Sequence, residues 1–82
     1  MDYRVAFNEL TYTGYKVMMF CLLNRERKEW TAIKYGEWLG LETHNSKEAW
    51  KRGTQDLLVK GWMVMDGNEM KWGERVKLFL KK

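Results

Sequence analysis

The spacing of apolar residues along the chain distinguishes predicted helices from predicted strands. Residues 17–23 form the longest apolar run, and the segment 15–23 that contains it predicts a mostly buried first helix that ends near Asn24. Thr11 and Thr13 precede this run and offer hydroxyls that can cap its N-terminus. Ahead of them, residues 3–7 alternate large apolar with small or polar side chains. We therefore expect a short N-terminal strand followed by the first helix.

A second helix is predicted after the polar connection at residues 25–29. Thr31 can cap this helix, and Gly40 can end it, because glycine tolerates the left-handed conformation found at helix ends. One apolar face is expected from three residues: Ile33, Gly36 and Leu39. Leu41 is expected to pack back against the helix.

A third helix should begin at Asn45 or Ser46, either of which can act as its cap. Residues with helical spacing then form one buried face: Trp50, Thr54, Leu57 and Leu58. Gly61 is expected to end this helix. Charged residues occupy the opposite face, so the third helix has one apolar and one charged side.

The C-terminal part has the pattern of a β-hairpin. Residues 62–65 and 75–80 are rich in apolar residues and are expected to form its two strands. Asp, Gly and Asn at positions 66–68, followed by Gly73, supply residues typical of turns. The predicted fold class is therefore α+β, with three helices, a C-terminal hairpin and a short N-terminal strand.

Length and composition indicate one folded domain over residues 1–82. The chain has no proline, no repeat and no low-complexity stretch, and 45% of its residues are hydrophobic. Cys21 lies inside the long apolar run, so we interpret it as a small hydrophobe in a reducing compartment. That run is too short to cross a membrane, and the N-terminus lacks the pattern of a signal peptide. A cytoplasmic location without membrane attachment is expected.

The net charge of +4 is distributed unevenly. Residues 1–42 contain six Lys or Arg and six Asp or Glu, whereas residues 43–82 contain nine and five. The excess positive charge is therefore C-terminal. This distribution favours a polyanionic partner, although a small basic surface also serves solubility.

Catalytic and cofactor motifs are absent from the sequence. It has no glycine-rich phosphate loop, no carboxylate pair at a convincing spacing, and no Ser-His or Cys-His arrangement. His44 has no cysteine or carboxylate partner at ligand spacing, so no metal site is expected. The sequence predicts a protein that is not an enzyme and that needs no cofactor.

The segment from Leu10 to Leu80 resembles the winged helix-turn-helix family, including its small phage and mobile-element members. Gly36 stands four residues before Gly40, where that family needs a very small residue because two helices touch. Trp50, Leu57 and the sequence Lys60-Gly61-Trp62-Met63 match the third helix and its exit into the wing.

Two departures from the family pattern lead to further expectations. Gly40 and Trp50 are about four residues further apart than in the tightest helix-turn-helix units, so the turn is expected to be extended. Gly53 and Thr54 stand where the family usually has Ala and Ile. Because glycine weakens a helix by about 0.8–1 kcal/mol relative to alanine, either another element approaches Gly53 closely or the site is suboptimal.

The resemblance implies a non-enzymatic DNA-binding accessory or regulatory protein, whose third helix enters the major groove. Four residues on the charged face of that helix are the candidates for DNA contacts: Lys47, Lys51, Arg52 and Gln55. Arginine pairs with guanine and glutamine with adenine, so Arg52 and Gln55 are the expected base readers, and the lysines suit phosphates. The alternative is an ordinary solvated helix face.

Further DNA contacts are implied at both ends of this region. His44 and Asn45 lie where the third helix begins, and helix N-termini attract phosphates, although Asn45 can equally be a simple cap. Lys71 and Arg75 flank the hairpin loop, which could follow the DNA backbone. Nearby acidic residues leave that loop almost neutral, so its role stays open.

Tryptophans support a second hypothesis, in which the domain binds a protein, as a phage factor that inhibits or recruits a host protein would. Trp38 could anchor such an interface or cover the edge of the core, and Trp72 could stack on neighbours or on a ligand. Trp30, Trp50 and Trp62 are expected in the core. Homodimerisation is compatible with either hypothesis, and the sequence does not decide it.

Overall fold

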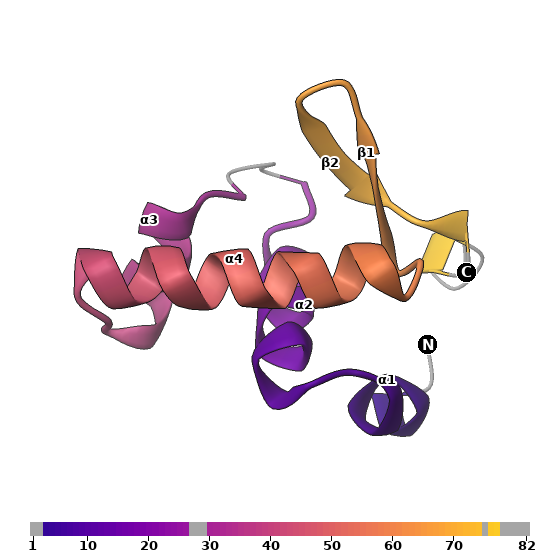
Figure 1. Cartoon of the computed structure of the whole chain (residues 1–82), viewed down its shortest axis with the longest axis horizontal. Coiled ribbons are helices and arrows are strands. Elements are labelled where there is room, and N and C mark those ends of the chain that lie inside the picture. Colours follow the sequence, from indigo (N-terminus) through magenta and orange to yellow (C-terminus); the bar gives the residue numbers. More distant parts are fainter. Residues whose placement is uncertain (1–2, 27–29, 75, 78–82) are drawn as a thin grey trace.

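The computed structural model describes residues 3–26, 30–74 and 76–77. Within these residues, four helices precede an antiparallel two-stranded hairpin, which is an α+β fold (Figure 1). The helices are α1 (Tyr3–Glu9), α2 (Tyr12–Leu23), α3 (Ala32–Leu39) and α4 (Thr43–Val59). The strands are β1 (Met63–Asp66) and β2 (Glu69–Trp72). The single domain expected over residues 1–82 stays a prediction.

The first element is a helix, so the prediction of a strand at residues 3–7 is wrong. Ala6 is fully buried and Leu10 is 6% exposed, and these two residues are four apart, which is the spacing of one helix face. This face packs against α2, and the ring of Phe7 meets the ring of Tyr15 edge to face at 5.5 Å. Because two residues four apart are buried on the same side, the burial pattern of this segment is that of a helix.

Helix α2 begins and ends as the sequence predicts. The Thr11 hydroxyl accepts a hydrogen bond from the Gly14 amide at 3.0 Å, and the helix is capped at its other end by Asn24. Its apolar run supplies much of the core: Val17, Met18, Phe20, Cys21 and Leu22. Burial raises the pKa of the Cys21 thiol, which keeps it protonated and confirms its interpretation as a small hydrophobe.

The caps of α3 are also confirmed, but its predicted buried face is partly wrong. Thr31 accepts a hydrogen bond from the Lys34 amide, and Gly40 has φ of +72°. Ile33 is 58% exposed, whereas Tyr35 is fully buried in its place. The buried side of α3 is therefore rotated relative to the prediction.

Tyr35 belongs to an aromatic cluster shared by three helices. Its ring lies 5.5 Å from the rings of both Phe20 and Trp50, and 6.2 Å from the ring of Trp38. The Tyr35 hydroxyl is buried and has no hydrogen-bond partner among the described residues. The cluster joins α2, α3 and α4 through ring contacts rather than polar ones.

The turn between α3 and α4 is short, which corrects the expectation of an extended turn. Only residues 40–42 separate the two helices, because α4 begins at Thr43 rather than after Asn45 or Ser46. The Leu41 amide donates to the Gly36 carbonyl at 2.9 Å, but the Leu41 side chain is 38% exposed. The additional residues lengthen α4 at its N-terminus instead of lengthening the turn.

The hairpin is tighter than predicted. β1 lies at residues 63–66, one residue later than the strand expected at 62–65, and it pairs with β2 at residues 69–72 through a turn in which Gly67 has φ of +65°. The register pairs Met63 with Trp72 and Met65 with Met70. Residues 74, 76 and 77 are helical, so the second strand predicted at residues 75–80 is wrong where that segment is described; residues 75 and 78–80 lie outside the described part.

Candidate nucleic-acid interface

Helix α4 packs against α2 and α3, and these contacts determine which of its faces is exposed. Leu57 is fully buried, and Gly53 packs directly against Thr13 and Val17 of α2. Near its N-terminus, Ser46 is 1% exposed and lies so close to Gly36 that a side chain at Gly36 would overlap it. The close approach expected at Gly36 is confirmed, and of the two alternatives left open at Gly53 the structure shows the close approach of another helix.

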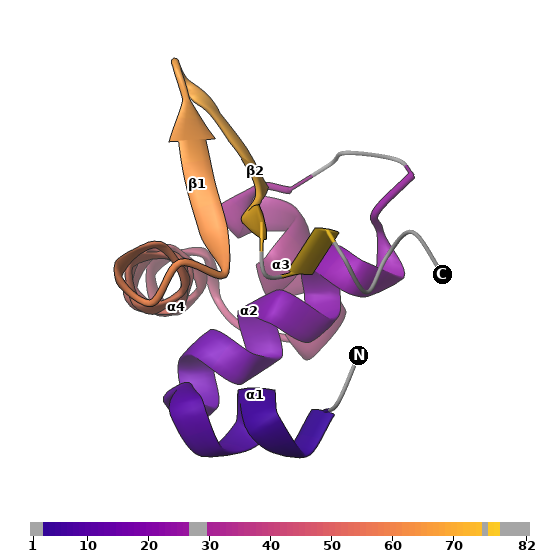
Figure 2. The same cartoon turned by 90° about the vertical axis from the view of Figure 1, so that its right-hand side faces the viewer.

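The opposite side of α4 is open. Figure 1 shows α4 lying across α2 and α3, and Figure 2 shows α4 end-on, with these helices on its inner side. Five exposed residues form what we call the outer face: Lys47, Glu48, Lys51, Arg52 and Gln55. None of its three cations forms an ion pair with a carboxylate of the described residues. These charges are accordingly available to a partner.

Val59 extends the outer face, and the sequence analysis missed it. It follows Gln55 by four residues and Arg52 by seven, which is the spacing of one helix side. Its side chain is 76% exposed, the highest value among the large exposed hydrophobic residues of the described chain. The same spacing, read from the sequence, could have found it.

Asp56 does not belong to the outer face, although the sequence places an acid on the same helix. Its side chain is 12% exposed and forms an ion pair with Lys60 at 2.9 Å. The amide and hydroxyl of Thr11 donate to the same carboxylate, at 2.7 and 3.0 Å. Asp56 thus ties α4 to the N-terminus of α2 and leaves Glu48 as the acid on the outer face.

Replacing Asp56 with Asn should lower the free energy of unfolding by about 1–2 kcal/mol near neutral pH, because charge-assisted hydrogen bonds are lost. Burial raises the pKa of Asp56, but the hydrogen bonds from Lys60 and Thr11 outweigh it and lower the pKa overall. The carboxylate thus stabilises the fold above its unfolded pKa of about 3.9, and this contribution disappears as the pH falls through the lower folded pKa.

Urea unfolding of both proteins across this pH range measures the difference. The wild type and Asp56→Asn should differ in stability at neutral pH and converge in acid. A difference that stays constant with pH would contradict the role given to this carboxylate. Gln55→Asn, one residue away on the exposed side, serves as the matched control and should change stability little.

His44 and Asn45 lie in the first turn of α4, not at its cap. The cap position is Glu42, whose side chain makes no capping hydrogen bond, so the capping role predicted for Asn45 or Ser46 is wrong. Instead, the Ser46 hydroxyl donates to the Thr43 carbonyl at 3.0 Å. Both His44 and Asn45 are exposed, beside amides that have no partner within the helix.

Acidic side chains offset the positive charge of the hairpin, as the sequence indicates. Lys71 forms an exposed ion pair with Asp66 at 2.8 Å, which raises the pKa of Lys71 and lowers that of Asp66. Arg75, the other predicted contact, lies outside the described residues. The described part of the hairpin is therefore nearly neutral at its tip.

Trp38 and Trp72, the two candidates for a protein interface, occupy different positions. Trp38 is 43% exposed while its ring also packs on Phe20 at 5.7 Å, so it both covers the core and faces solvent. Trp72 is partly buried and packs against Trp30. Trp62 is 2% exposed and is in the core as expected, whereas Trp30 and Trp50 are partly buried at its edge.

The part of the chain that the structure describes offers no cluster of three His, Cys, Asp or Glu residues able to hold a metal ion. None of its helices has the length and apolar character needed to span a bilayer. No protein-family model, curated protein or solved structure matches the chain.

Proposed function

We propose that the chain is a winged helix-turn-helix protein that binds duplex DNA through the outer face of α4. Helix α3, the short turn at residues 40–42 and α4 correspond to the helix-turn-helix, and the hairpin of β1 and β2 corresponds to the wing. The hairpin follows α4 directly and rises from its C-terminal end (Figure 1). This order of elements supports the assignment.

The observation that carries the proposal is the outer face itself. Lys47, Lys51 and Arg52 are exposed without carboxylate partners among the described residues, while Leu57 and Gly53 hold the other side of α4 against the core. A single helix with side chains of this kind fits the major groove of B-DNA. Long cationic side chains of this kind can bind both phosphate oxygens and the edges of bases.

Roles on the outer face follow from side-chain chemistry. Arg52 and Gln55, three residues apart, present groups that pair with guanine and adenine respectively. Lys47 and Lys51, four residues apart on the outer face, have side chains that suit phosphates, and Val59 adds a methyl-bearing side chain that can contact thymine. His44 and Asn45 add polar groups at the start of α4. Such a protein would act as a regulatory or accessory factor rather than as an enzyme.

A gel-shift series tests the proposal with pools of random duplex DNA. The protein should shift the duplex at low salt, and its affinity should fall as salt rises, because phosphate contacts release counterions. Repeated selection of bound sequences should then enrich a defined site. Failure to shift any duplex at micromolar protein would contradict DNA binding.

A second function is favoured by exposed apolar side chains around α3. Ile33 is 58% exposed, Trp38 is 43% exposed and Leu41 is 38% exposed. Exposed aromatic residues are frequent anchors of protein interfaces. In that case, a pull-down from nuclease-treated bacterial lysate should retain a stoichiometric partner, and Trp38→Ala should lose it while the outer-face variants keep it.

A further inference from the structure

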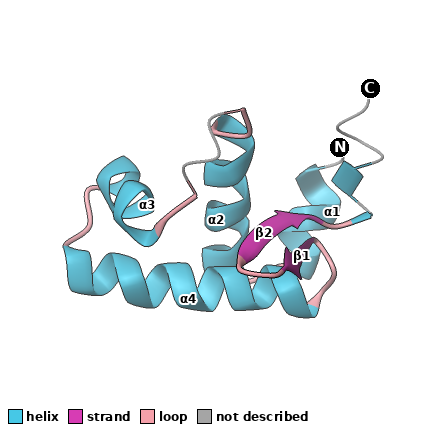
Figure 3. Ribbon diagram, turned by 90° about the horizontal axis from the view of Figure 1, so that it is seen from above, coloured by secondary structure: helices cyan, strands magenta, loops and turns pink. Residues whose placement is uncertain are grey.

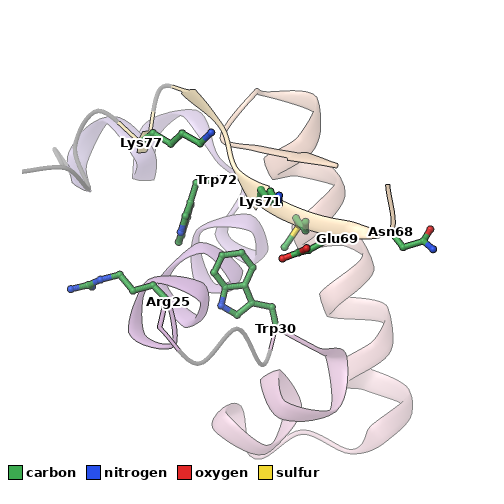
Figure 4. A pocket seen from close by; sticks show the side chains of 8 residues that line it. Arg25, Trp30, Asn68, Glu69, Lys71, Trp72 and Lys77 are labelled. Carbon is green, nitrogen blue, oxygen red and sulfur yellow. The ribbon is translucent and has the colours of Figure 1, made fainter. Parts of the chain in front are cut away.

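A pocket of about 420 Å³ opens between β2 and the segment that leads into α3 (Figure 4). No described residue of α4 lines this pocket, so it is separate from the outer face. Seen from above, the hairpin lies beside the C-terminal half of α4 (Figure 3). The volume is within the range of pockets that hold small organic ligands.

Two tryptophans form the apolar wall of the pocket. The rings of Trp30 and Trp72 meet edge to face, with their centres 5.2 Å apart and their planes at 73°. The Trp30 indole donates to the Asn24 carbonyl at 3.2 Å, which fixes its orientation. Both rings are partly buried, and Met70 adds a third apolar contact to the wall. A flat aromatic ligand could stack against such a preformed surface.

Cations surround this wall. Lys71 and Lys77 also line the pocket, and Figure 4 shows the Lys77 side chain extending beside Trp72 in the direction of Lys71. Their partners Asp66 and Glu74 are 68% and 88% exposed, and ion pairs this exposed contribute little. A ligand phosphate can therefore compete for both ammonium groups. Arg25, also at the pocket, has no carboxylate partner among the described residues.

Glu69 restricts the ligand further. Glu69 is the acidic residue among those that line the pocket, and its carboxylate would repel a ligand that offered only negative charge. A ligand that also presents a hydrogen-bond donor to Glu69 removes this conflict, as the amino group of adenine or cytosine does. We infer that the pocket binds a nucleotide whose base carries an amino group, with the base on the Trp30 and Trp72 rings and the phosphate near Lys77. This goes beyond the duplex binding proposed for α4.

Titration of the full chain with AMP tests this inference, followed by the indole N–H signals in NMR spectra of ¹⁵N-labelled protein. The signals of Trp30 and Trp72 should shift and saturate, whereas the buried Trp62 should stay unchanged as an internal reference. Adenosine tests the base alone, and ribose 5-phosphate tests the phosphate alone. Each should bind at least about fivefold more weakly than AMP, because each lacks half of the contacts.

Variants inside and outside the pocket separate binding from folding. Lys77→Ala should weaken AMP binding about fivefold, while Lys16→Ala, on α2, should leave it unchanged. Glu69→Gln should reduce the preference for AMP over UMP, whose base has no amino group. The double variant Lys51→Ala and Arg52→Ala should still bind AMP even if it no longer binds duplex DNA. The two proposals can therefore fail independently of each other. Any of three results would overturn the inference. These are a lack of saturable shifts with AMP, binding of ribose 5-phosphate as tight as that of AMP, and saturation of the pocket by an aromatic acidic peptide alone.

Discussion

Alanine at both Lys51 and Arg52 is expected to weaken the binding of duplex DNA about a hundredfold at low salt. Both side chains are exposed on the outer face of α4, and neither has a carboxylate partner among the described residues. On the proposed function, removing them would eliminate a base contact by Arg52 and a phosphate contact by Lys51. The salt dependence of the affinity should become shallower in parallel, because fewer counterions are released on binding.

Fluorescence anisotropy with a labelled duplex at several salt concentrations measures both effects. The matched control is the double variant Lys16→Ala and Lys34→Ala, which loses the same charge at positions outside α4 and outside the pocket. If the two double variants lose affinity equally, net charge alone explains the binding, and the assignment to the outer face is wrong. Gln55→Ala should instead leave non-specific affinity nearly unchanged and relax the preference at a single base pair.

Local signals in the sequence predict part of this fold correctly. The hydroxyls of Thr11 and Thr31 and the left-handed Gly40 mark helix ends through interactions within a few residues, and all three act as expected. The resemblance to the winged helix-turn-helix family also singles out Gly36, which needs to be small because Ser46 lies against it. Such features depend on short-range geometry that the sequence displays directly.

Other elements depend on contacts that the sequence does not display. Residues 3–7 fit a strand or a helix by pattern alone, and the burial of Ala6 and Leu10 against α2 selects the helix. The second strand was expected at residues 75–80 from its apolar content. The two-residue turn at Gly67 and Asn68 instead pairs β1 with residues 69–72, since a tight turn fixes the register.

The candidate site was predictable to a similar degree. Five charged or polar residues of α4 fall on its outer face as their spacing indicates, because a long helix has a fixed periodicity. The inward position of Asp56 was not predictable, since it depends on Thr11, which is 45 residues earlier in the chain. The pocket beside Trp30 and Trp72 likewise requires two segments that meet only in the folded protein.

Valine at Gly53 is expected to lower the free energy of unfolding by about 3 kcal/mol or more, which is enough to unfold much of a small domain. Helix propensity alone predicts the opposite sign, because any side chain replaces the flexible backbone of glycine. At this position, however, an added Cβ would overlap a methyl group of Val17 and would lie 3.0 Å from the Thr13 carbonyl oxygen. Neither the branched Val17 nor the backbone of α2 can move without opening the contact between α2 and α4.

Gln55→Val is the control, because it places the same β-branched residue in the same helix at an exposed position. It should cost only a few tenths of a kcal/mol, about the difference in helix propensity. Urea unfolding followed by tryptophan fluorescence compares the two variants. A Gly53→Val protein as stable as the wild type would show that α4 can sit further from α2, and the direction of the outer face, which depends on that contact, would then have to be revised.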